Sequence, residues 1–401
     1  MPEILILCEY PTLNGGERSM LATLDGVRAG GFVPAVIAPP DGPLAMELAT
    51  HGVELIPFQC QGADGTRIAQ SRLREQLAEI LRRRRPALLH ANSLAMGRLS
   101  GPVAADCGLP SIAHLRDIIR LSVQAVADLN RHRRLLAVSA ATREFHVAGG
   151  LDAEKTHVLY NGVDLEEFCP RTPMGYLHRE LGLPSDAQLI GNIGQIGLRK
   201  GQDVLLQAAE MIDHSLGAGL TATGGADIPV CQDGGVTLGR QECLPHRAEN
   251  VHFLIVGERN SDKEESRQYE EKLRVVAGTR LPGRVHFLGR RNNIPSLLNE
   301  LTLLVHTARQ EPLGRVLLEA AASGVAVVAT DVGGTREIFP PEADAARLVP
   351  PDDPARLATT LDLLGNRELL KHLGTAARCC AEERFDIRKN VGELIRHYKA
   401  I

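Results

Sequence analysis

The chain contains no apolar stretch that approaches the roughly 20 residues needed to cross a bilayer. Its first residues, Met1 to Cys8, have no basic segment, and their apolar run is too short for a secretory signal. Positive charge is not in excess, because the formal net charge of the 401 residues is -4. That balance argues against nucleic acid as the main partner. We therefore expect a cytoplasmic protein that does not span a membrane.

The cysteines show no spacing typical of a disulfide framework. They are Cys8, Cys60, Cys107, Cys169, Cys231, Cys243, Cys379 and Cys380. In a chain this long they indicate reduced thiols. Cys231, Cys243 and His246 lie in one polar segment, but their spacing fits no common zinc site and no fourth ligand is evident. The sequence therefore predicts no metal and no cofactor.

What the sequence does contain is a regular alternation of short apolar runs and longer helical patterns. At 401 residues the chain exceeds one ordinary domain, and two domains of about 150–200 residues are expected. Strands are predicted in the first half at 3–8, 33–38, 53–57, 87–90, 111–114 and 135–139. Helices are predicted between them at 17–29, 44–51, 67–85, 93–106 and 123–133. This pattern is typical of a parallel sheet covered by helices.

The second half repeats the alternation after a proline-containing linker at 169–173. Its predicted strands are 189–195, 251–256, 284–288, 301–306 and 325–329. Its predicted helices are 204–212, 264–277, 313–322, 355–364 and 367–384, with a last helix that places Val391, Leu394, Ile395 and Tyr398 on one side. Residues 214–250 have no helical or strand period, so we interpret them as an inserted, poorly ordered surface loop.

Two carboxylates flank the start of the helix predicted at 313–322. Glu311 lies in the loop after the strand 301–306, and Glu319 lies roughly two helical turns beyond it. Open α/β sheets bind ligands beyond the carboxyl ends of their strands. Glu311 could then bind hydroxyls and Glu319 a ribose. The alternative is that Glu311 only favours a helix N-terminus and Glu319 is a solvated charge.

Amides at the start of the same helix suit an anion. Free N–H groups near Leu313 and Gly314, which follow Pro312 in the loop, could hold a diphosphate with the help of the helix dipole. The donor-binding residues predicted here are therefore Glu311, Pro312, Leu313, Gly314 and Glu319.

The residues around this pair resemble a known family. Glu-Pro-Leu-Gly-Arg-Val-Leu-Leu-Glu-Ala at 311–320 precedes Ser-Gly-Val-Ala-Val-Val-Ala-Thr-Asp-Val-Gly-Gly-Thr-Arg-Glu-Ile at 323–338. This order resembles the nucleotide-sugar half of glycosyltransferase family 4, whose mark is a Glu-x7-Glu pair. Leu313 stands where an aromatic residue is frequent in that family.

The resemblance implies a fold as well as a chemistry. Family 4 enzymes are retaining glycosyltransferases of the GT-B fold, which has two Rossmann-like parallel-sheet domains facing a central cleft. It would place an acceptor-side domain at 1–168 and a nucleotide-sugar-binding domain at 169–385. A C-terminal helix at 386–401 would return to the first domain.

A lysine in the second half is a candidate phosphate ligand. Lys200 precedes the helix 204–212, where an ammonium can lie against a diphosphate whose departure builds negative charge on oxygen. A surface lysine is the alternative. The context resembles the family's phosphate-binding Lys, although many members carry Arg five residues earlier, where this chain has Gln195. Arg199 is a candidate for the missing charge.

The first half offers a histidine and a glycine pair. His114 ends the strand 111–114 and resembles the family's histidine that contacts the transferred sugar, although a lone histidine is more often structural. Gly15 and Gly16 let backbone amides approach a ligand at a helix N-terminus. They resemble the family's glycine loop near the acceptor and the donor phosphate; a tight turn would explain them as well.

Two further predictions concern the base and the membrane. Backbone near Gly289 and Arg290, after the strand 284–288, resembles the turn that lines the family's base pocket. The helix 67–85 is rich in arginine, which indicates a solvated surface or a peripheral contact with anionic lipid.

The sequence thus predicts a retaining transferase that moves a sugar from a nucleoside-diphosphate sugar to a glycan, lipid-linked or small-molecule acceptor. Glu311 and His114 are its predicted catalytic residues. A nucleotide-sugar epimerase of the same fold and an inactive glycan- or nucleotide-binding homologue are the alternatives.

Overall fold

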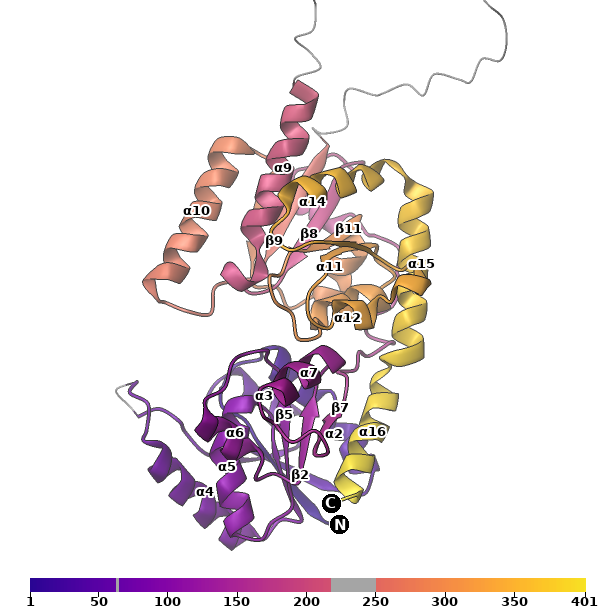
Figure 1. Ribbon diagram of the computed structural model, residues 1–401. Coiled ribbons are helices and arrows are strands. Elements are labelled where there is room, and N and C mark those ends of the chain that lie inside the picture. The colour runs from indigo at the N-terminus through magenta and orange to yellow at the C-terminus, as the bar shows by residue number, and fades with distance from the viewer. Residues whose placement is uncertain (63–64, 218–249) are drawn as a thin grey trace, which may run out of the picture.

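Two parallel sheets form the framework of the protein. The structure is a computed structural model that describes residues 1–62, 65–217 and 250–401 (Figure 1). In this part of the chain the first sheet has seven strands in the order β3-β2-β1-β4-β5-β6-β7. Its strands are β1 Glu3–Leu7, β2 Val33–Ala38, β3 Glu54–Pro57, β4 Leu88–Ala91, β5 Ser111–Leu115, β6 Arg134–Ala137 and β7 Thr156–Val158. The strand order reverses beside β1, where open α/β sheets bind ligands.

Helices cover both faces of this sheet, which is why its central strands are mostly apolar and buried. Leu5 and Leu7 pack into one hydrophobic cluster, and Ile4 and Ile6 pack into another on the opposite face. Such burial on both faces is expected of parallel sheets. The helices are α1 Gly15–Leu21, α2 Leu24–Ala29, α3 Pro43–Thr50, α4 Gln70–Arg84, α5 Leu94–Asp106, α6 Val123–Leu129 and α7 Ala140–Ala148.

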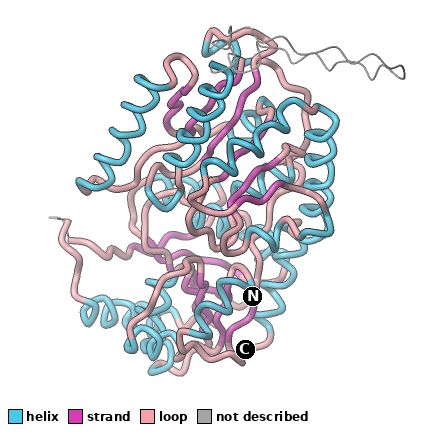
Figure 2. The backbone as a smooth tube through the Cα atoms, turned by 45° about the horizontal axis from the view of Figure 1, so that its top comes forward, coloured by secondary structure: helices cyan, strands magenta, loops and turns pink. Residues whose placement is uncertain are grey.

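The second sheet has, in the described residues, six parallel strands in the order β10-β9-β8-β11-β12-β13. They are β8 Gln188–Ile193, β9 Val251–Val256, β10 Val285–Gly289, β11 Leu303–His306, β12 Val327–Thr330 and β13 Arg347–Val349. Its helices are α8 Tyr176–Leu181, α9 Gln202–Gly217, α10 Glu264–Arg280, α11 Ile294–Glu300, α12 Arg315–Ala322, α13 Thr335–Ile338, α14 Pro354–Thr360 and α15 Arg367–Arg384, with short 3₁₀ turns η1 Leu198–Lys200, η3 Pro341–Ala343 and η4 Leu361–Gly365. Figure 2 shows the two groups of strands with loops gathered between them.

The last helix crosses from the second sheet to the first. Helix α16 Ile387–Lys399 follows α15 and lies beside the first sheet, where both chain termini are found (Figure 1). Its buried Leu394 and Tyr398 join the cluster that contains Ile4 and Ile6. The crossing is fixed by backbone hydrogen bonds, from Val163 N to Phe385 O at 2.8 Å and from Ile387 N to Val163 O at 3.0 Å.

Hydrogen bonds from Glu337 and Gln310 join the two domains on their facing sides. Glu337 of the second domain accepts from the amides of Ala140, at 2.7 Å, and Ala141, at 2.9 Å, which begin α7. Gln310 Nε2 donates to the carbonyl of Ile118 at 2.6 Å. The carboxylate at the start of α7 suits a helix N-terminus, where N–H groups lack intrahelical partners.

The predicted α/β class with two parallel sheets is confirmed, whereas several element bounds differ. The helix predicted at 17–29 is two helices, because the Thr23 hydroxyl bonds the Met20 carbonyl at 2.7 Å at the break. Helix α4 begins at Gln70, since Arg67 instead forms a bridge with Gln61. Helices α7 and α8 and strand β13 were not predicted. The domain bounds 1–168, 169–385 and 386–401 stay a prediction.

The predicted loop at 214–250 differs at its start. Helix α9 continues to Gly217, so residues 214–217 are helical, and the remainder up to Asn250 lies outside the described residues. Cys231, Cys243 and His246, weighed above as zinc ligands, also lie outside them. No helix within the described ranges is both long and apolar enough to cross a membrane.

The packing of α16 predicts a stability effect. Leu394 is 2% exposed, and truncating such a side chain typically costs about 2–5 kcal/mol. Leu394→Ala should therefore lower the free energy of unfolding of the first domain by this amount in urea titrations. Arg396→Ala, at an exposed position of the same helix, is the control and should change it by less than about 0.5 kcal/mol. Equal effects of both variants would contradict this packing.

Candidate active site

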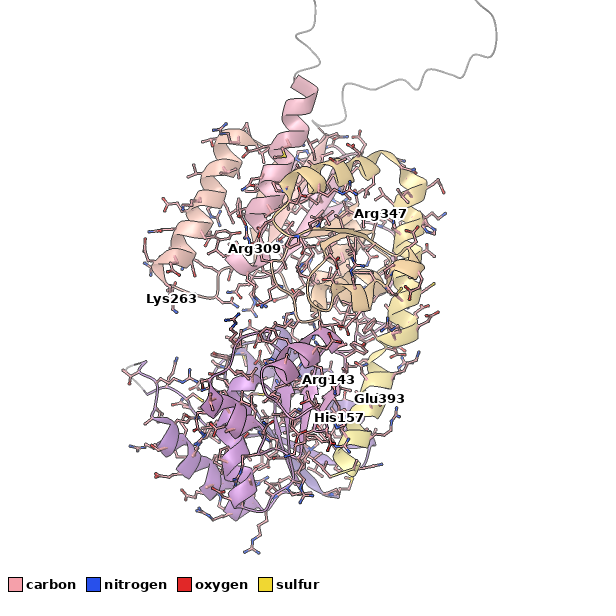
Figure 3. The ribbon with its side chains drawn as sticks, viewed as in Figure 1. Arg143, His157, Lys263, Arg309, Arg347 and Glu393 are labelled. Carbon is pink, nitrogen blue, oxygen red and sulfur yellow. The ribbon has the colours of Figure 1, made fainter. Side chains whose placement is uncertain are left out.

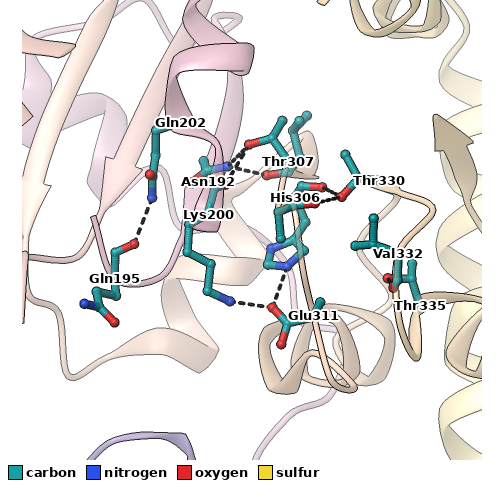
Figure 4. A network of polar contacts seen from close by, with 12 residues as sticks. Asn192, Gln195, Lys200, Gln202, His306, Thr307, Glu311, Thr330, Val332 and Thr335 are labelled. Atoms are coloured by element: carbon teal, nitrogen blue, oxygen red, sulfur yellow. Dashed lines mark hydrogen bonds and ion pairs between the residues drawn. The ribbon is translucent and has the colours of Figure 1, made fainter. Parts of the chain in front are cut away.

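An ion pair between two loops forms the centre of the candidate site. Lys200 ends η1 after β8, and Glu311 lies in the loop after β11, so both stand at the carboxyl edge of the second sheet. The Lys200 ammonium pairs with Oε2 of Glu311, and His306 Nε2 donates to the same oxygen at 2.9 Å. Figure 4 shows the two side chains pointing toward one another, with the imidazole beside them.

The pair keeps a buried carboxylate charged. Glu311 is 7% exposed, and burial alone would raise its pKa. The Lys200 ammonium and the His306 hydrogen bond outweigh burial, so the pKa of Glu311 lies well below its usual range. Burial lowers the pKa of His306, which is therefore neutral and donates its single N–H. The other oxygen, Oε1, has no hydrogen bond among the described residues and can accept from a ligand.

Two glycines allow the loops to meet. Gly201 has a φ of +64°, and a Cβ there would lie 2.1 Å from the carbonyl oxygen of Thr307. Gly333 has a φ of +53°, and a Cβ there would lie 1.9 Å from the carbonyl oxygen of Glu311. No side chain fits such a contact. The Gly-Gly turn at 333–334 therefore supports the backbone of Glu311, whose carbonyl also accepts from the amide of Gly334 at 3.1 Å.

Arg309 holds the lysine turn from the other side. Its guanidinium donates to the carbonyl of Leu198 at 2.6 Å and to Asp203 at 2.8 Å and 3.0 Å. It also donates to Asp352 at 2.6 Å, and its amide donates to the carbonyl of Arg199 at 2.8 Å. Figure 3 places Arg309 in the second domain. Sequence analysis missed Arg309 and His306. Nothing in the local pattern shows that Arg309 faces Leu198 and Asp203, about a hundred positions earlier. The contact of His306 with Glu311, by contrast, spans only five residues.

Glu319 lies on α12, which begins later than predicted. The helix starts at Arg315, with Gly314 as its N-cap, so Leu313 and Gly314 precede it; Leu313 is buried in the core. Arg315 Nε donates to Glu319 Oε1 at 2.6 Å, and its Nη1 lies 3.5 Å from Ser19 Oγ on α1 of the first domain. The start of α12 therefore faces α1, and Pro312 directly follows Glu311 in the loop before this helix.

No contact in the described residues identifies a second cation beside Lys200, where the sequence has Gln195 and Arg199. Gln195 is exposed, and its carbonyl accepts from Gln202 Nε2 at 3.0 Å (Figure 4). Arg199 is exposed, one residue before Lys200, and its side chain forms no ion pair within the described ranges. Its role as a replacement charge stays a prediction.

Gly289 and Arg290 lie at the end of the edge strand β10. The carbonyl of Gly289 accepts from the amide of Gly257 at 2.9 Å, and the amide of Arg290 donates to Glu258 Oε1 at 3.3 Å. These residues follow β9 and β10 at the same sheet edge as Lys200. From the neighbouring loop, Asn260 Nδ2 donates to Asn14 Oδ1 at 3.4 Å, across the domain junction.

Gly15 and Gly16 begin α1, directly after Asn14. The side chain of Asn92 donates to the carbonyl of Gly16 at 3.1 Å. Gly16 also lies against Arg116, because a Cβ there would be 3.4 Å from its Cδ. The glycine turn is therefore packed onto the carboxyl ends of β4 and β5, which Asn92 and Arg116 follow.

His114 is buried in β5 and belongs to a network that sequence analysis missed. Its Nδ1 lies 2.8 Å from His90 Nε2 and 3.3 Å from an Arg116 nitrogen. Burial, followed by the charge of Arg116, lowers the pKa of His114 well below its usual value. The histidine is therefore neutral and suited to hydrogen bonding, not to carrying charge.

The residues of this site define a class of protein. The carboxyl edges of two parallel sheets meet at one junction, which brings a lysine and two glutamates opposite a histidine and a glycine turn. This is the arrangement of a GT-B protein. Among the described residues, no group of three or more His, Cys, Asp or Glu side chains is placed to hold a metal ion.

Comparisons with known families and structures agree with this class. The profile described as Glycosyltransferase Family 4 matches residues 13–167, and that described as Glycosyl transferases group 1 matches residues 235–366. The chain belongs to this family of glycosyltransferases. Anabaena HepE in complex with UDP and glucose superposes with a TM-score of 0.80 at 23% identity, over 100% of both chains. The glycosyltransferase WaaG superposes with a TM-score of 0.70 at 17% identity, over 99% of this chain and 100% of the other.

Two curated relatives are similar in sequence. The lipopolysaccharide core biosynthesis mannosyltransferase LpsB of Rhizobium meliloti is 30% identical over 57% of this chain and 58% of its own length. The D-inositol 3-phosphate glycosyltransferase of Xylanimonas cellulosilytica is 29% identical over 60% of this chain and 49% of its own length. The chain thus spans about half the length of these relatives.

The Lys200–Glu311 pair predicts a characteristic pattern of stability. Lys200→Met leaves a buried carboxylate without its ammonium, and breaking a buried pair from one side typically costs about 3–5 kcal/mol. We expect that loss in urea unfolding at pH 7. The double variant Lys200→Met/Glu311→Gln removes the charge as well and should recover most of it. A double variant no more stable than Lys200→Met would contradict the pairing.

The same pair predicts a pH dependence. The pKa of Glu311 is lower in the folded protein than the roughly 4.3 of an unfolded glutamate. Its stabilisation is therefore present above about pH 4.3 and is lost as the pH falls toward the folded pKa. Glu311→Gln should lose this part of the acid sensitivity, which unfolding at pH 7 and pH 4 measures against the parent protein. An identical pH dependence of both proteins would contradict the assignment.

Proposed function

We propose that the protein transfers a sugar from a nucleoside-diphosphate sugar to a hydroxyl of an acceptor, with retention of the anomeric configuration. The observation that carries the proposal is the Lys200–Glu311 pair at the carboxyl edge of the second sheet. It places a fixed ammonium and a free carboxylate oxygen within one loop cluster. Membership of a family of glycosyltransferases supports the reaction class, and the retaining outcome is taken from the family resemblance.

Each side chain has a role that its environment suits. Lys200 stabilises the negative charge that develops on the departing diphosphate, as a preorganised cation does without solvent reorganisation. Oε1 of Glu311 accepts from hydroxyls of the donor sugar, and Glu319 accepts from the ribose. His114 contacts the sugar from the first domain, and backbone at Gly289 and Arg290 contacts the base.

The donor class has support from the relatives as well. The solved structures similar in fold include complexes of HepE with UDP and with UDP-glucose. By analogy, a nucleoside diphosphate would lie between the Lys200 turn, the start of α12 and the Gly15–Gly16 turn. The amides of Arg315 and Val316, the first of α12, replace Leu313 and Gly314 as the helical donors in this proposal.

A cavity in the first domain supports a small hydroxyl-bearing acceptor. It measures about 320 Å³ and lies beyond the carboxyl ends of β1, β2 and β3, lined in part by Glu9, Tyr10, Asp41 and Arg67. Arg67 pairs with Glu9 at 3.0 Å. A pocket of this volume lined by two carboxylates, a phenol and a guanidinium suits a sugar or polyol, including one carried on a lipid.

The peripheral membrane contact proposed for α4 has weaker support. Arg72, Arg82, Arg83 and Arg85 are exposed at or beside this helix. Arg74 pairs with Asp128, and Arg84 pairs with Glu3 and Glu54. The apolar side of α4 is buried in the core, so any attraction to anionic lipid on the inner side of a membrane would rest on charge alone.

Nucleotide binding tests the donor site. A ligand that binds only the folded protein raises its melting temperature, so one of UDP, GDP, ADP or TDP should give a clear shift. Glu319→Ala should weaken that nucleotide roughly 10–100-fold, as expected for loss of a hydrogen bond to a charged group. Glu342→Ala, at an exposed position, is the control. No shift with any nucleotide would count against a transferase and favour an inactive glycan-binding homologue.

Sugar transfer tests the role of Glu311. Glu311→Ala should abolish transfer and donor hydrolysis while keeping most nucleotide affinity, because its free oxygen is assigned to the sugar and not to the nucleotide. Release of nucleoside diphosphate and formation of glycosylated product are measured together. Unchanged transfer would defeat the assignment, and interconversion of the donor sugar without release of nucleotide would instead indicate the epimerase.

A further inference from the structure

A buried hydrogen-bonded relay links the C-terminal helix to His114. The Tyr398 hydroxyl on α16 lies 2.7 Å from His90 Nδ1 on β4, and His90 Nε2 lies 2.8 Å from His114 Nδ1 on β5. Tyr398 is 5%, His90 3% and His114 5% exposed. The tyrosine is 308 residues from His90 in the sequence, so the relay exists only because α16 packs against the first sheet.

The position of each proton in the relay follows from Arg116. A guanidinium has only donors, so the Arg116 nitrogen 3.3 Å from His114 Nδ1 requires that nitrogen to accept. Three further hydrogen bonds fix Arg116, to the Asn92 carbonyl at 2.9 Å, Asn92 Oδ1 at 2.9 Å and Asn161 Oδ1 at 2.8 Å. The guanidinium cannot turn away from the histidine without breaking them.

The remaining protons are then determined in order. Because His114 Nδ1 accepts, the proton shared with His90 resides on His90 Nε2. A neutral imidazole carries one N–H, so His90 Nδ1 accepts and the Tyr398 hydroxyl donates. Burial lowers the pKa of His90 to about 3, so it stays neutral. Burial also raises the pKa of Tyr398, which keeps its proton.

This leaves the single proton of His114 on Nε2. That nitrogen has no hydrogen-bond partner in the described part of the chain. It is also not fully buried, so solvent or a ligand can reach it. It is therefore a hydrogen-bond donor whose direction is fixed by the contacts of His90 and Arg116 with the other ring nitrogen, Nδ1.

We propose that His90 and Tyr398 are positioning residues that, with Arg116, hold His114 as a neutral Nε2–H donor toward the transferred sugar. The inference rests on the proposed function for the identity of the ligand, which is a hydroxyl or ring oxygen of the sugar. It also assigns a role that His114 does not have. An Nε2 that already carries a proton cannot remove one from the acceptor hydroxyl, so His114 is not the general base.

The sharpest test reads the tautomers directly. In the full-length protein with ¹⁵N-labelled histidine, long-range ¹H–¹⁵N correlation spectra distinguish a protonated ring nitrogen from an unprotonated one. We expect Nε2 to be protonated and Nδ1 unprotonated in both His114 and His90. Protonation of His114 Nδ1, or of His90 Nδ1, would overturn the proposal.

The protein contains an internal reference for this experiment. His132 is buried in the same domain, with Nε2 2.9 Å from the Gly97 carbonyl and Nδ1 2.9 Å from the Ser111 hydroxyl. A carbonyl only accepts, so His132 also carries its proton on Nε2. Its signals should not change in variants of the relay.

Variants separate positioning from packing. Tyr398→Phe keeps the ring against Phe32 but leaves His90 Nδ1 without a donor. The His90 Nδ1 signal should therefore move, while the proton stays on Nε2, where it is donated to His114. We expect kcat to fall roughly ten-fold, as for a lost transition-state hydrogen bond, with little change in nucleotide affinity. Arg396→Ala, at an exposed position of α16, is the control and should leave the tautomers unchanged. Unchanged His90 signals in Tyr398→Phe would contradict the proposal.

A second variant keeps the test decisive if Tyr398→Phe does not fold. His90→Gln can still donate an amide N–H to His114 Nδ1 and should keep the His114 tautomer and more activity than His90→Leu, which cannot donate. Equal activity of these two variants would argue against positioning through His90. Failure of the proposed function is recognised separately: the tautomers would be as expected, but no donor would be turned over.

Discussion

A buried carboxylate that must stay charged is the constraint on which the site depends. Moving a carboxylate out of water costs several kcal/mol unless a partner of opposite charge accompanies it. Glu311 therefore requires Lys200, which follows a different strand, and His306, which precedes it on β11. The loops after β8 and β11 have to meet, and they meet at backbone distances that only glycine allows at 201 and 333. The Gly-Gly turn, the lysine turn and the glutamate loop thus follow from one electrostatic requirement.

Burial favours the neutral form of the ionisable groups in both halves of the site, but the neighbouring charges act differently in each half. In the second domain a nearby ammonium overrides burial, so Glu311 stays an anion. In the first domain Arg116 adds its charge to burial, so His90 and His114 stay neutral. The result is a charged pair on one side of the junction and neutral donors on the other. That division suits a reaction in which charge develops on the leaving diphosphate and not on the transferred sugar's hydroxyls.

How much the sequence could predict depended on the distance over which each interaction acts. Apolar runs such as 33–38 and 251–256 predicted β2 and β9 to the residue, because burial on both faces leaves a local signal. Lys200, Glu311 and Glu319 could be singled out because strand, loop and helix come in register with a known family.

The elements and contacts that were not predicted have both local and long-range causes. Helix α7 had usable signals, a Ser139 N-cap bonded to Thr142 N at 3.0 Å and a Gly149–Gly150 end, but β13 has only three residues. The His306–Glu311 hydrogen bond could have been predicted, because only five positions separate the two residues in the sequence. The contact of Tyr398 with His90 was not, because it depends on the docking of α16.

The two halves of the site are organised independently of each other. The relay from Tyr398 to His114 lies within the first sheet and α16, which pack as one hydrophobic cluster with Ile4 and Leu394. The Lys200–Glu311 pair lies within the second sheet. The chain passes between the domains twice, near Val163 and near Asp386. These two segments are hydrogen-bonded to each other.

A rotation about that paired crossing would change the approach of the two halves without altering either of them. The contacts that set the approach include polar ones, such as Glu337 on the start of α7 and Gln310 on Ile118, and an apolar one through Val138. Preorganised donors and charges stabilise a transition state because they need no rearrangement when the reaction occurs. In this protein each half of the site is held by its own contacts, the Lys200–Glu311 pair by His306 and the relay to His114 by Arg116.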